Sequence, residues 1–133
     1  LCGVDNGWLG AAEISYGGWN AAGRAKLAGE VVTKRLRRDK TVSNLPLRVD
    51  IIGVNSVFSF GEPREEMLDA RLRFCVRAPD KESAQAALAE AETLATNGPA
   101  GGGGKTQSLR RTIRTYATYL PREQIQPNWQ MVQ

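Results

Sequence analysis

The sequence predicts an α/β (α+β) domain of the ferredoxin-like type: a split β-α-β antiparallel sheet with two helices on one face. The main observation is the order of the periodic segments, which reads strand, helix, strand, strand, helix, strand. A second is the segment Ala70–Arg77, which alternates apolar and polar residues and so has one core face. With 133 residues and 41% hydrophobic content, the chain can build one core but not two comfortable ones. We therefore expect residues 1–133 to form a single α/β domain or a fragment of a larger protein.

The first half of the chain supplies a strand, a helix and a second strand. Trp8–Tyr16 is typical of a strand, and Gly17-Gly18 closes it. Asn20 is suited to cap a helix that runs to Arg38. That helix has an apolar stripe at helical spacing, made of Ala21, Ala25, Ala28, Val32 and Leu36. After Pro46, the near-continuous apolar run Leu47–Val54 predicts a buried central strand.

The second half supplies two more strands around a second helix. After a loop over Ser59–Arg64, the alternating strand places Leu72, Phe74 and Val76 toward the core and Arg71, Arg73, Cys75 and Arg77 on the opposite face. Asp80 is suited to cap an alanine-rich helix over Ser83–Leu94. The β-branched and aromatic segment Arg111–Tyr119 predicts the last strand, and the tail from Pro121 to Gln133 an extended arm. The arginine-bearing sheet face is left uncovered, so it is solvated, docks another domain or binds an anion.

Composition excludes several kinds of chemistry. The chain contains no histidine, which rules out Ser-His and Cys-His nucleophile pairs and the usual zinc sites within it. Its two cysteines give neither a disulfide framework nor a metal quartet, so we expect no metal and a cytoplasmic protein. No apolar stretch approaches the roughly 20 residues that span a bilayer, so we expect no membrane partner. The chain starts at Leu1 rather than Met, which suggests a segment of a longer polypeptide.

The most informative stretch is the glycine-rich run Thr96–Thr106. It resembles a phosphate-binding P-loop but has Pro99 where the first glycine belongs, and it lies between a helix and a strand instead of the reverse. We expect it to be a loop, either a flexible connector or a nest of backbone N–H groups for an anion. In the second case Lys105 would supply a positive charge and Arg122 a planar fork for a carboxylate. The candidate anion-binding residues are Asn97, Gly101, Gly102, Gly103, Gly104, Lys105 and Arg122.

Four segments together resemble the acyclic terpene utilisation family, AtuA: Gly10–Gly18, Arg48–Ser56, Thr96–Gly104 and Tyr119–Glu123. The resemblance spans nearly the whole chain and implies that it is the C-terminal part of a longer family domain. It also implies a role in the catabolism of branched terpenoid alcohols through CoA thioesters, and it carries over no catalytic residues. Family members often have Asp where this chain has Asn55 before Ser56, which leaves Asp50 as an alternative carboxylate.

Three function hypotheses follow. In the first, the chain belongs to an enzyme that acts on an acyl-CoA or a small carboxylate, and Glu13 or Tyr16 could move protons. We expect no cofactor in this case, although a CoA thioester could be the substrate. The isolated segment is expected to be inactive. In the second, it is a non-catalytic assembly module whose open sheet face and Tyr116, Tyr119 and Trp129 contact the remainder of a longer polypeptide or a second subunit, with a homo-oligomer expected. The third, nucleic-acid binding through basic segments, is disfavoured because the strands lack paired aromatic residues.

Overall fold

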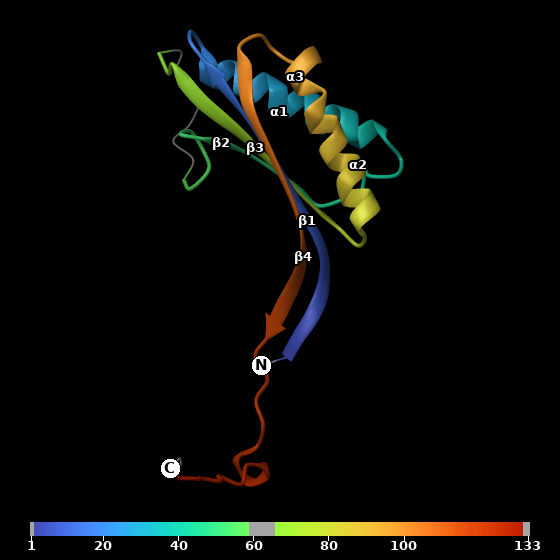
Figure 1. The fold of residues 1–133 in the computed structure, drawn as a ribbon, viewed down its shortest axis with the longest axis vertical. Coiled ribbons are helices and arrows are strands. Elements are labelled where there is room, and N and C mark those ends of the chain that lie inside the picture. The colour runs from blue at the N-terminus through green and yellow to red at the C-terminus, as the bar shows by residue number, and fades with distance from the viewer. Residues whose placement is uncertain (1, 59–65, 132–133) are drawn as a thin grey trace.

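The computed structural model describes residues 2–58 and 66–131. In chain order its elements are β1 (Cys2–Gly17), α1 (Ala21–Arg38), β2 (Leu47–Ile52), β3 (Asp69–Ala78), α2 (Lys81–Glu92), α3 (Leu94–Asn97), β4 (Gly102–Tyr116) and the 3₁₀ turn η1 (Arg122–Gln124) (Figure 1). The loop that we expected over Ser59–Arg64 lies outside the described residues. No helix in the described ranges is long and apolar enough to cross a membrane.

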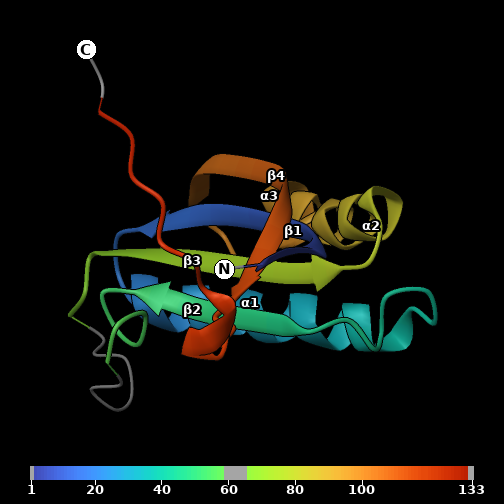
Figure 2. The same ribbon diagram turned by 90° about the horizontal axis from the view of Figure 1, so that it is seen from below.

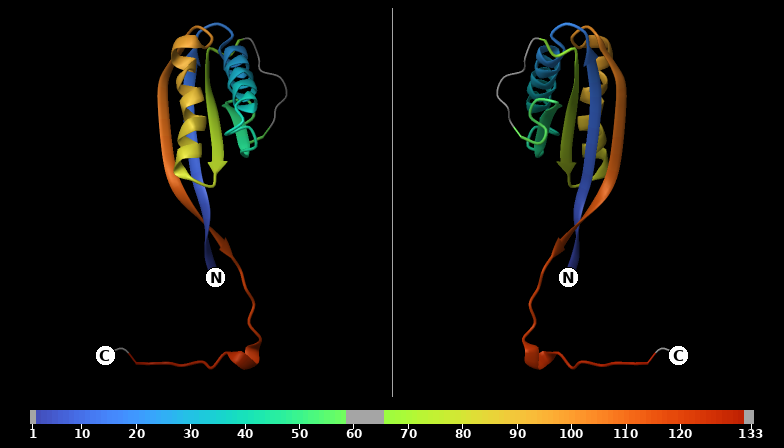
Figure 3. Two further views of the ribbon diagram at one scale, coloured as in Figure 1. Left: turned by 90° about the vertical axis from the view of Figure 1, so that its right-hand side faces the viewer. Right: turned by 90° about the vertical axis from the view of Figure 1, so that its left-hand side faces the viewer.

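The four strands form one antiparallel sheet in the order β2-β3-β1-β4. This order is that of a split β-α-β fold, in which each helix connects strands that are not neighbours in the sheet. Both long helices lie on the same face of the sheet, and the other face is uncovered (Figures 2 and 3). The predicted ferredoxin-like fold class is confirmed.

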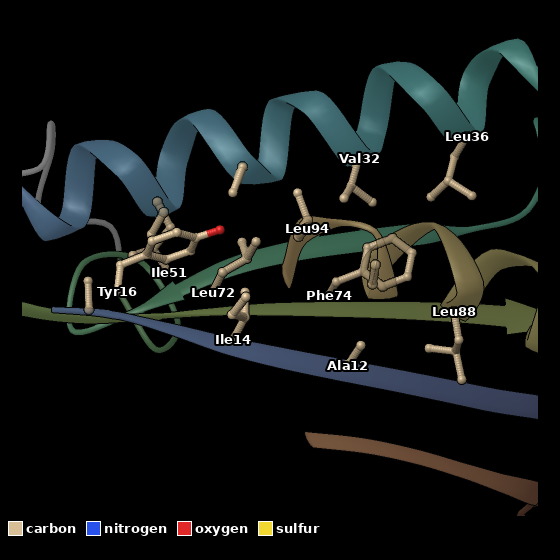
Figure 4. Close-up of a cluster of buried hydrophobic side chains, with 14 of the residues drawn as sticks. Ala12, Ile14, Tyr16, Val32, Leu36, Ile51, Leu72, Phe74, Leu88 and Leu94 are labelled. Carbon is tan, nitrogen blue, oxygen red and sulfur yellow. The ribbon is translucent and has the colours of Figure 1, made fainter. Parts of the chain in front are cut away.

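The core lies between the helices and the sheet (Figure 4). Leu72, Phe74 and Val76 of β3 each keep only 2% of their surface exposed, as their alternation predicts. The alanine stripe of α1 is also buried, with Ala25 and Ala28 fully covered. Small side chains let the helices approach the sheet closely, because little volume stands between the two backbones.

Both predicted helix caps are present. The side chain of Asn20 accepts a hydrogen bond from the backbone N–H of Gly23 at 3.2 Å, and Asp80 accepts one from Ser83 at 2.7 Å. These bonds satisfy backbone N–H groups that have no partner within the first turn of a helix. Helix α2 begins two residues earlier than Ser83, since the cap fixes its start.

The position of the second strand was predicted wrongly. Strand β2 pairs only with β3 and is an edge strand, not a central one. Its apolar residues are covered by α1 rather than by a second neighbouring strand, and Ile51 is 5% exposed. The continuous apolar run thus indicated correctly that the strand is buried, but it did not indicate whether the strand lies at the centre or at the edge of the sheet.

The last strand also differs from its predicted range of Arg111–Tyr119. Strand β4 begins at Gly102, so three of the glycines that we expected in a loop lie in the strand, and two of them, Gly102 and Gly103, are paired with β1. It ends at Tyr116, whose partner Cys2 is the first residue of β1.

At its far end the sheet narrows to a two-stranded ribbon. Between Asp5 and Trp8, β1 carries one more residue than β4, and the hydroxyl of Thr112 donates to the carbonyls of Asn6 and Gly7 at 3.0 and 3.1 Å. A bulge of this kind bends a strand and increases its twist. Beyond it, β1 and β4 leave the sheet together, and the segment 117–131 continues away from the domain (Figure 1). We call residues 2–5, 113–116 and 117–131 the arm.

Candidate functional site

Gly101, which precedes strand β4, packs against the side chain of Arg24. Gly101 has a φ of +80°, and a Cβ there would lie 2.2 Å from Nη1 of Arg24. Arg24 donates to the carbonyls of Ala100, Gly17 and Trp19 at 2.6, 2.6 and 2.8 Å. Its guanidinium thus ties the start of β4 to the end of β1. Glycine is required at position 101 both by the backbone angle and by the nearness of this guanidinium.

The next glycines begin the strand. A Cβ at Gly102 would lie 3.2 Å from the ring of Tyr16, whereas one at Gly103 would meet no atom within 4 Å. Gly104 has a φ of +60°, and between the pairs Ser15–Gly103 and Glu13–Thr106 strand β4 carries one extra residue. Glycine in the left-handed region at the first position of a bulge is the G1 type. Packing at Gly102 and the bulge at Gly104 are therefore structural reasons for the glycines.

The other residues of the predicted anion site are not brought together. Lys105 lies 3.1 Å from the carboxylate of Glu92 on α2. Asn97 ends α3, close in sequence to the glycines, and its side chain is exposed. Arg122 begins η1 in the arm, which extends away from the end of the sheet where the glycines lie (Figure 3). Arg122 would reach the glycine run only after a rearrangement of the arm.

The open sheet face carries a network of arginines. Arg71 donates to Glu13 at 2.5 Å, to the hydroxyl of Ser15 at 2.6 Å and to that of Thr106 at 3.1 Å, linking three strands. Glu13, which we considered as a proton carrier, serves as the partner of this arginine. Charge-assisted bonds of this kind hold the guanidinium in place.

Asp50 is the second centre of the network. It is 4% exposed and accepts hydrogen bonds from Arg48 at 2.9 Å and from Arg73 at 3.0 Å. The side chain of Arg48 remains 67% exposed. A buried carboxylate needs such partners, so Asp50, which we considered as an alternative carboxylate, serves as a structural hydrogen-bond acceptor. Asn55, where the family pattern has Asp, accepts a bond from the backbone N–H of Ile51 at 2.6 Å and holds the turn after β2.

Below this network the open face carries two further arginines, Arg77 and Arg110. The register places Leu9 of β1 opposite both Arg77 of β3 and Arg110 of β4, so these three side chains form one row across the sheet. Arg77 and Arg110 are exposed, and no carboxylate partner is found for them in the part of the chain that the structure describes. We call this set the basic row. The sequence placed Arg77 on this face, whereas the predicted strand Arg111–Tyr119 did not include Arg110, because β4 begins earlier than predicted.

Two titratable groups are perturbed by burial. Burial raises the pKa of the Cys75 thiol, which lies on the open face opposite Ala11 and Arg48. Burial also raises the pKa of Tyr16, although the nearby Arg24 opposes the shift. The Tyr16 hydroxyl is fully buried and has no hydrogen-bond partner among the described residues. It lies within the core (Figure 4), where a substrate has no access, so a role in proton transfer is not supported.

The comparisons with known proteins identify the family. The model of the acyclic terpene utilisation family protein AtuA matches residues 1–131. The chain belongs to this family. No curated protein and no solved structure was found to match it. The resemblance carried by the four sequence segments is confirmed, and membership of AtuA suggests a role in acyclic terpene utilisation. Among the described residues no group of three or more His, Cys, Asp or Glu side chains is placed to hold a metal ion.

Proposed function

We propose that this chain is a non-catalytic assembly module of an acyclic terpene utilisation protein and that it docks through its arm. The observation that carries the proposal is the series of large apolar side chains exposed along the arm. They include Tyr119 at 94% exposure, Trp129 at 81% and Met131 at 81%. The others are Val4, Ile113, Tyr116, Leu120 and Ile125.

Such an arm gains little from its own domain. A two-stranded ribbon is marginally stable in water by itself, and the hydrogen bonds of the segment 117–131 are local ones around η1. Contiguous exposed apolar surface marks interaction sites, and aromatic residues are enriched at interfaces. Covering one large apolar side chain contributes about 1.5–3 kcal/mol. The remainder of a longer polypeptide or a second subunit would supply the covering surface.

Trypsin tests this proposal, because Arg122 lies in the middle of the arm. We expect cleavage after Arg122 to be at least about tenfold slower in the assembly isolated from its natural source than in the 133-residue chain alone. The double variant Tyr119→Ser with Trp129→Ser should restore fast cleavage. A matched control replaces Trp19 and Leu27, which are 74% and 52% exposed elsewhere on the domain. Equal cleavage rates in the assembly and the isolated chain would refute docking through the arm.

A second candidate is anion binding at the glycine run, with a CoA thioester as the substrate. It is favoured by one observation: the start of β4 is an outer edge of the sheet, and Gly103 has open space around it. Backbone N–H groups on a free edge are accessible to an anion. Lys105 would then have to exchange Glu92 for the ligand. Binding of CoA by the wild-type chain, weakened by Gly103→Ala, would support this function, and undetectable binding of CoA would exclude it.

A further inference from the structure

The open sheet face divides into a half whose charges pair and a half in which cations predominate. In the upper half, Glu13 and Asp50 lie among Arg71 and Arg73 and neutralise them. In the lower half, the basic row of Arg77, Leu9 and Arg110 contains no carboxylate, and neither arginine forms an ion pair with another described residue. The guanidinium of Arg48 borders this half and shares Asp50 with Arg73. Positive charge therefore exceeds negative charge there.

The shape of this half is shallow and its floor is apolar. Next to the basic row, the small side chains of Cys75 and Ala11 face each other across β3 and β1. A hollow of about 280 Å³ lies at this place, bordered by Leu9, Arg48, Cys75 and Arg77. Figure 3 shows that no helix covers this side of the sheet. Arginines around a partly apolar floor suit an interface, because guanidinium groups lose less hydration on burial than ammonium groups do.

We propose that the basic row binds the carboxylates of an acidic protein surface. This inference rests on the proposed function as a docking module and names the chemistry of its partner. Charge complementarity selects the partner: Arg77 and Arg110 each offer a planar fork that matches a carboxylate, and Leu9 between them excludes water. The partner's Asp or Glu side chains thus complete ion pairs that residues 2–58 and 66–131 leave open.

Three other occupants fit less well. A second copy docked by the same face would oppose arginine with arginine, since a two-fold interface puts one patch against itself. A small anion would find a shallow surface rather than the concave site that such ligands favour. RNA-binding sheets stack bases on aromatic side chains, and the described open-face positions of β1, β3 and β4 that neighbour the basic row are aliphatic, polar or charged.

A dye-labelled polyglutamate peptide is the probe, and fluorescence anisotropy at low and physiological salt is the measurement. We expect the chain to bind it in a salt-dependent way, and Arg77→Gln with Arg110→Gln to raise the Kd by about tenfold or more. The matched control, Lys34→Gln with Arg38→Gln on α1, removes the same charge from the helical side and should change the Kd less than about twofold. Circular dichroism verifies that both variants fold.

Cys75 gives a readout that needs no mutation. Because it lies beside the basic row, saturating peptide should slow its alkylation by iodoacetamide, while the exposed Cys2 on the arm reacts at an unchanged rate. Several outcomes would overturn the proposal: equal effects of the two double variants, tighter binding of oligouridine or CoA than of the peptide, or self-association that the arginine variant abolishes. The arm variants of the trypsin experiment leave the basic row intact, so failure of this inference and failure of docking through the arm are separately visible.

Discussion

At the scale of single residues, the hydroxyl of Tyr16 is a polar group within the core that has no hydrogen-bond partner among the described residues. A buried hydroxyl without a partner loses its bonds to water and gains none in return. The ring itself is needed, because it fills the space between α1 and the sheet and touches Gly102. The polar atom and the packing of Tyr16 therefore act on stability in opposite directions.

We expect Tyr16→Phe to raise the free energy of unfolding by about 1 kcal/mol, since it removes the unpaired hydroxyl and keeps the ring. The sign of the pH dependence follows from the raised pKa. Below the unfolded-state value near 10.0 the protonated group has its full stabilising effect, which is lost as the pH rises through the higher folded-state pKa. Urea denaturation between pH 8 and about 11 measures both effects. Tyr119→Phe, at an exposed site, is the control, and a destabilised Tyr16→Phe would show that the hydroxyl has a partner.

The glycines of the run make a matched pair of substitutions. Gly101→Ala places a Cβ against the Arg24 guanidinium and strains a positive φ, so we expect it to cost about 1–3 kcal/mol of stability. Gly103→Ala has open space in a strand and should stabilise the chain by about 0.5 kcal/mol through the unfolded state. Thermal unfolding separates the two cases. If both variants unfold at the wild-type temperature, the packing of Arg24 against the run contributes nothing.

At the scale of elements, β3 shows how far the sequence could be read. Its alternation is unambiguous because a charged or weakly polar residue separates each pair of core residues, and the sheet keeps one face wet. Glycine has no side chain and so leaves no periodicity to read, which is why the start of β4 was assigned to a loop. The edge position of β2 was also missed. A strand that is buried under a helix has the same continuous apolar sequence as a strand that lies between two other strands.

The candidate site was less predictable than the fold, for a physical reason. Arg24 binds the carbonyl of Ala100, a residue 76 positions away, and no local pattern marks such a contact. The pairing of Lys105 with Glu92 is likewise a product of how α2 lies along β4. Spacing predicts which side of an element a residue occupies, whereas its partner depends on the tertiary structure.

Phe74 is the element-scale test of the core. It is 2% exposed and lies between the sheet and both helices (Figure 4). Phe74→Ala should lower the free energy of unfolding by about 3–5 kcal/mol, because it removes apolar contacts and leaves a cavity. Cys75→Ala, one residue along on the open face, is the control and should cost less than about 1.5 kcal/mol. An unchanged melting temperature for Phe74→Ala would contradict the packing described here.

At the scale of the whole molecule, the chain combines a closed core with two surfaces that are left open. The helices bury the core side chains of β1, β2 and β3 on one face of the sheet, so the hydrophobic core does not depend on cover over the other face. The open face differs in chemistry from the arm: one is rich in arginine and the other in aromatic and aliphatic residues. Electrostatic attraction acts over a Debye length and steers encounter, whereas apolar burial acts at contact and slows dissociation. A partner that offers acidic and apolar surface would use both.

This separation predicts that the domain folds without the end of the arm. Ending the chain after Tyr116 removes no residue of the core and no hydrogen bond between the domain and the segment 117–131 that the structure describes. We expect the melting temperature to stay within about 2 °C of that of the intact chain, since the removed side chains are exposed before and after unfolding. Binding to the partner should weaken by at least about tenfold, because Tyr119 and Trp129 are lost. Calorimetry and sedimentation of the same samples measure the two quantities. A large fall in melting temperature would mean that the segment packs onto the domain in solution, and the arm would then be part of the fold and not a means of docking.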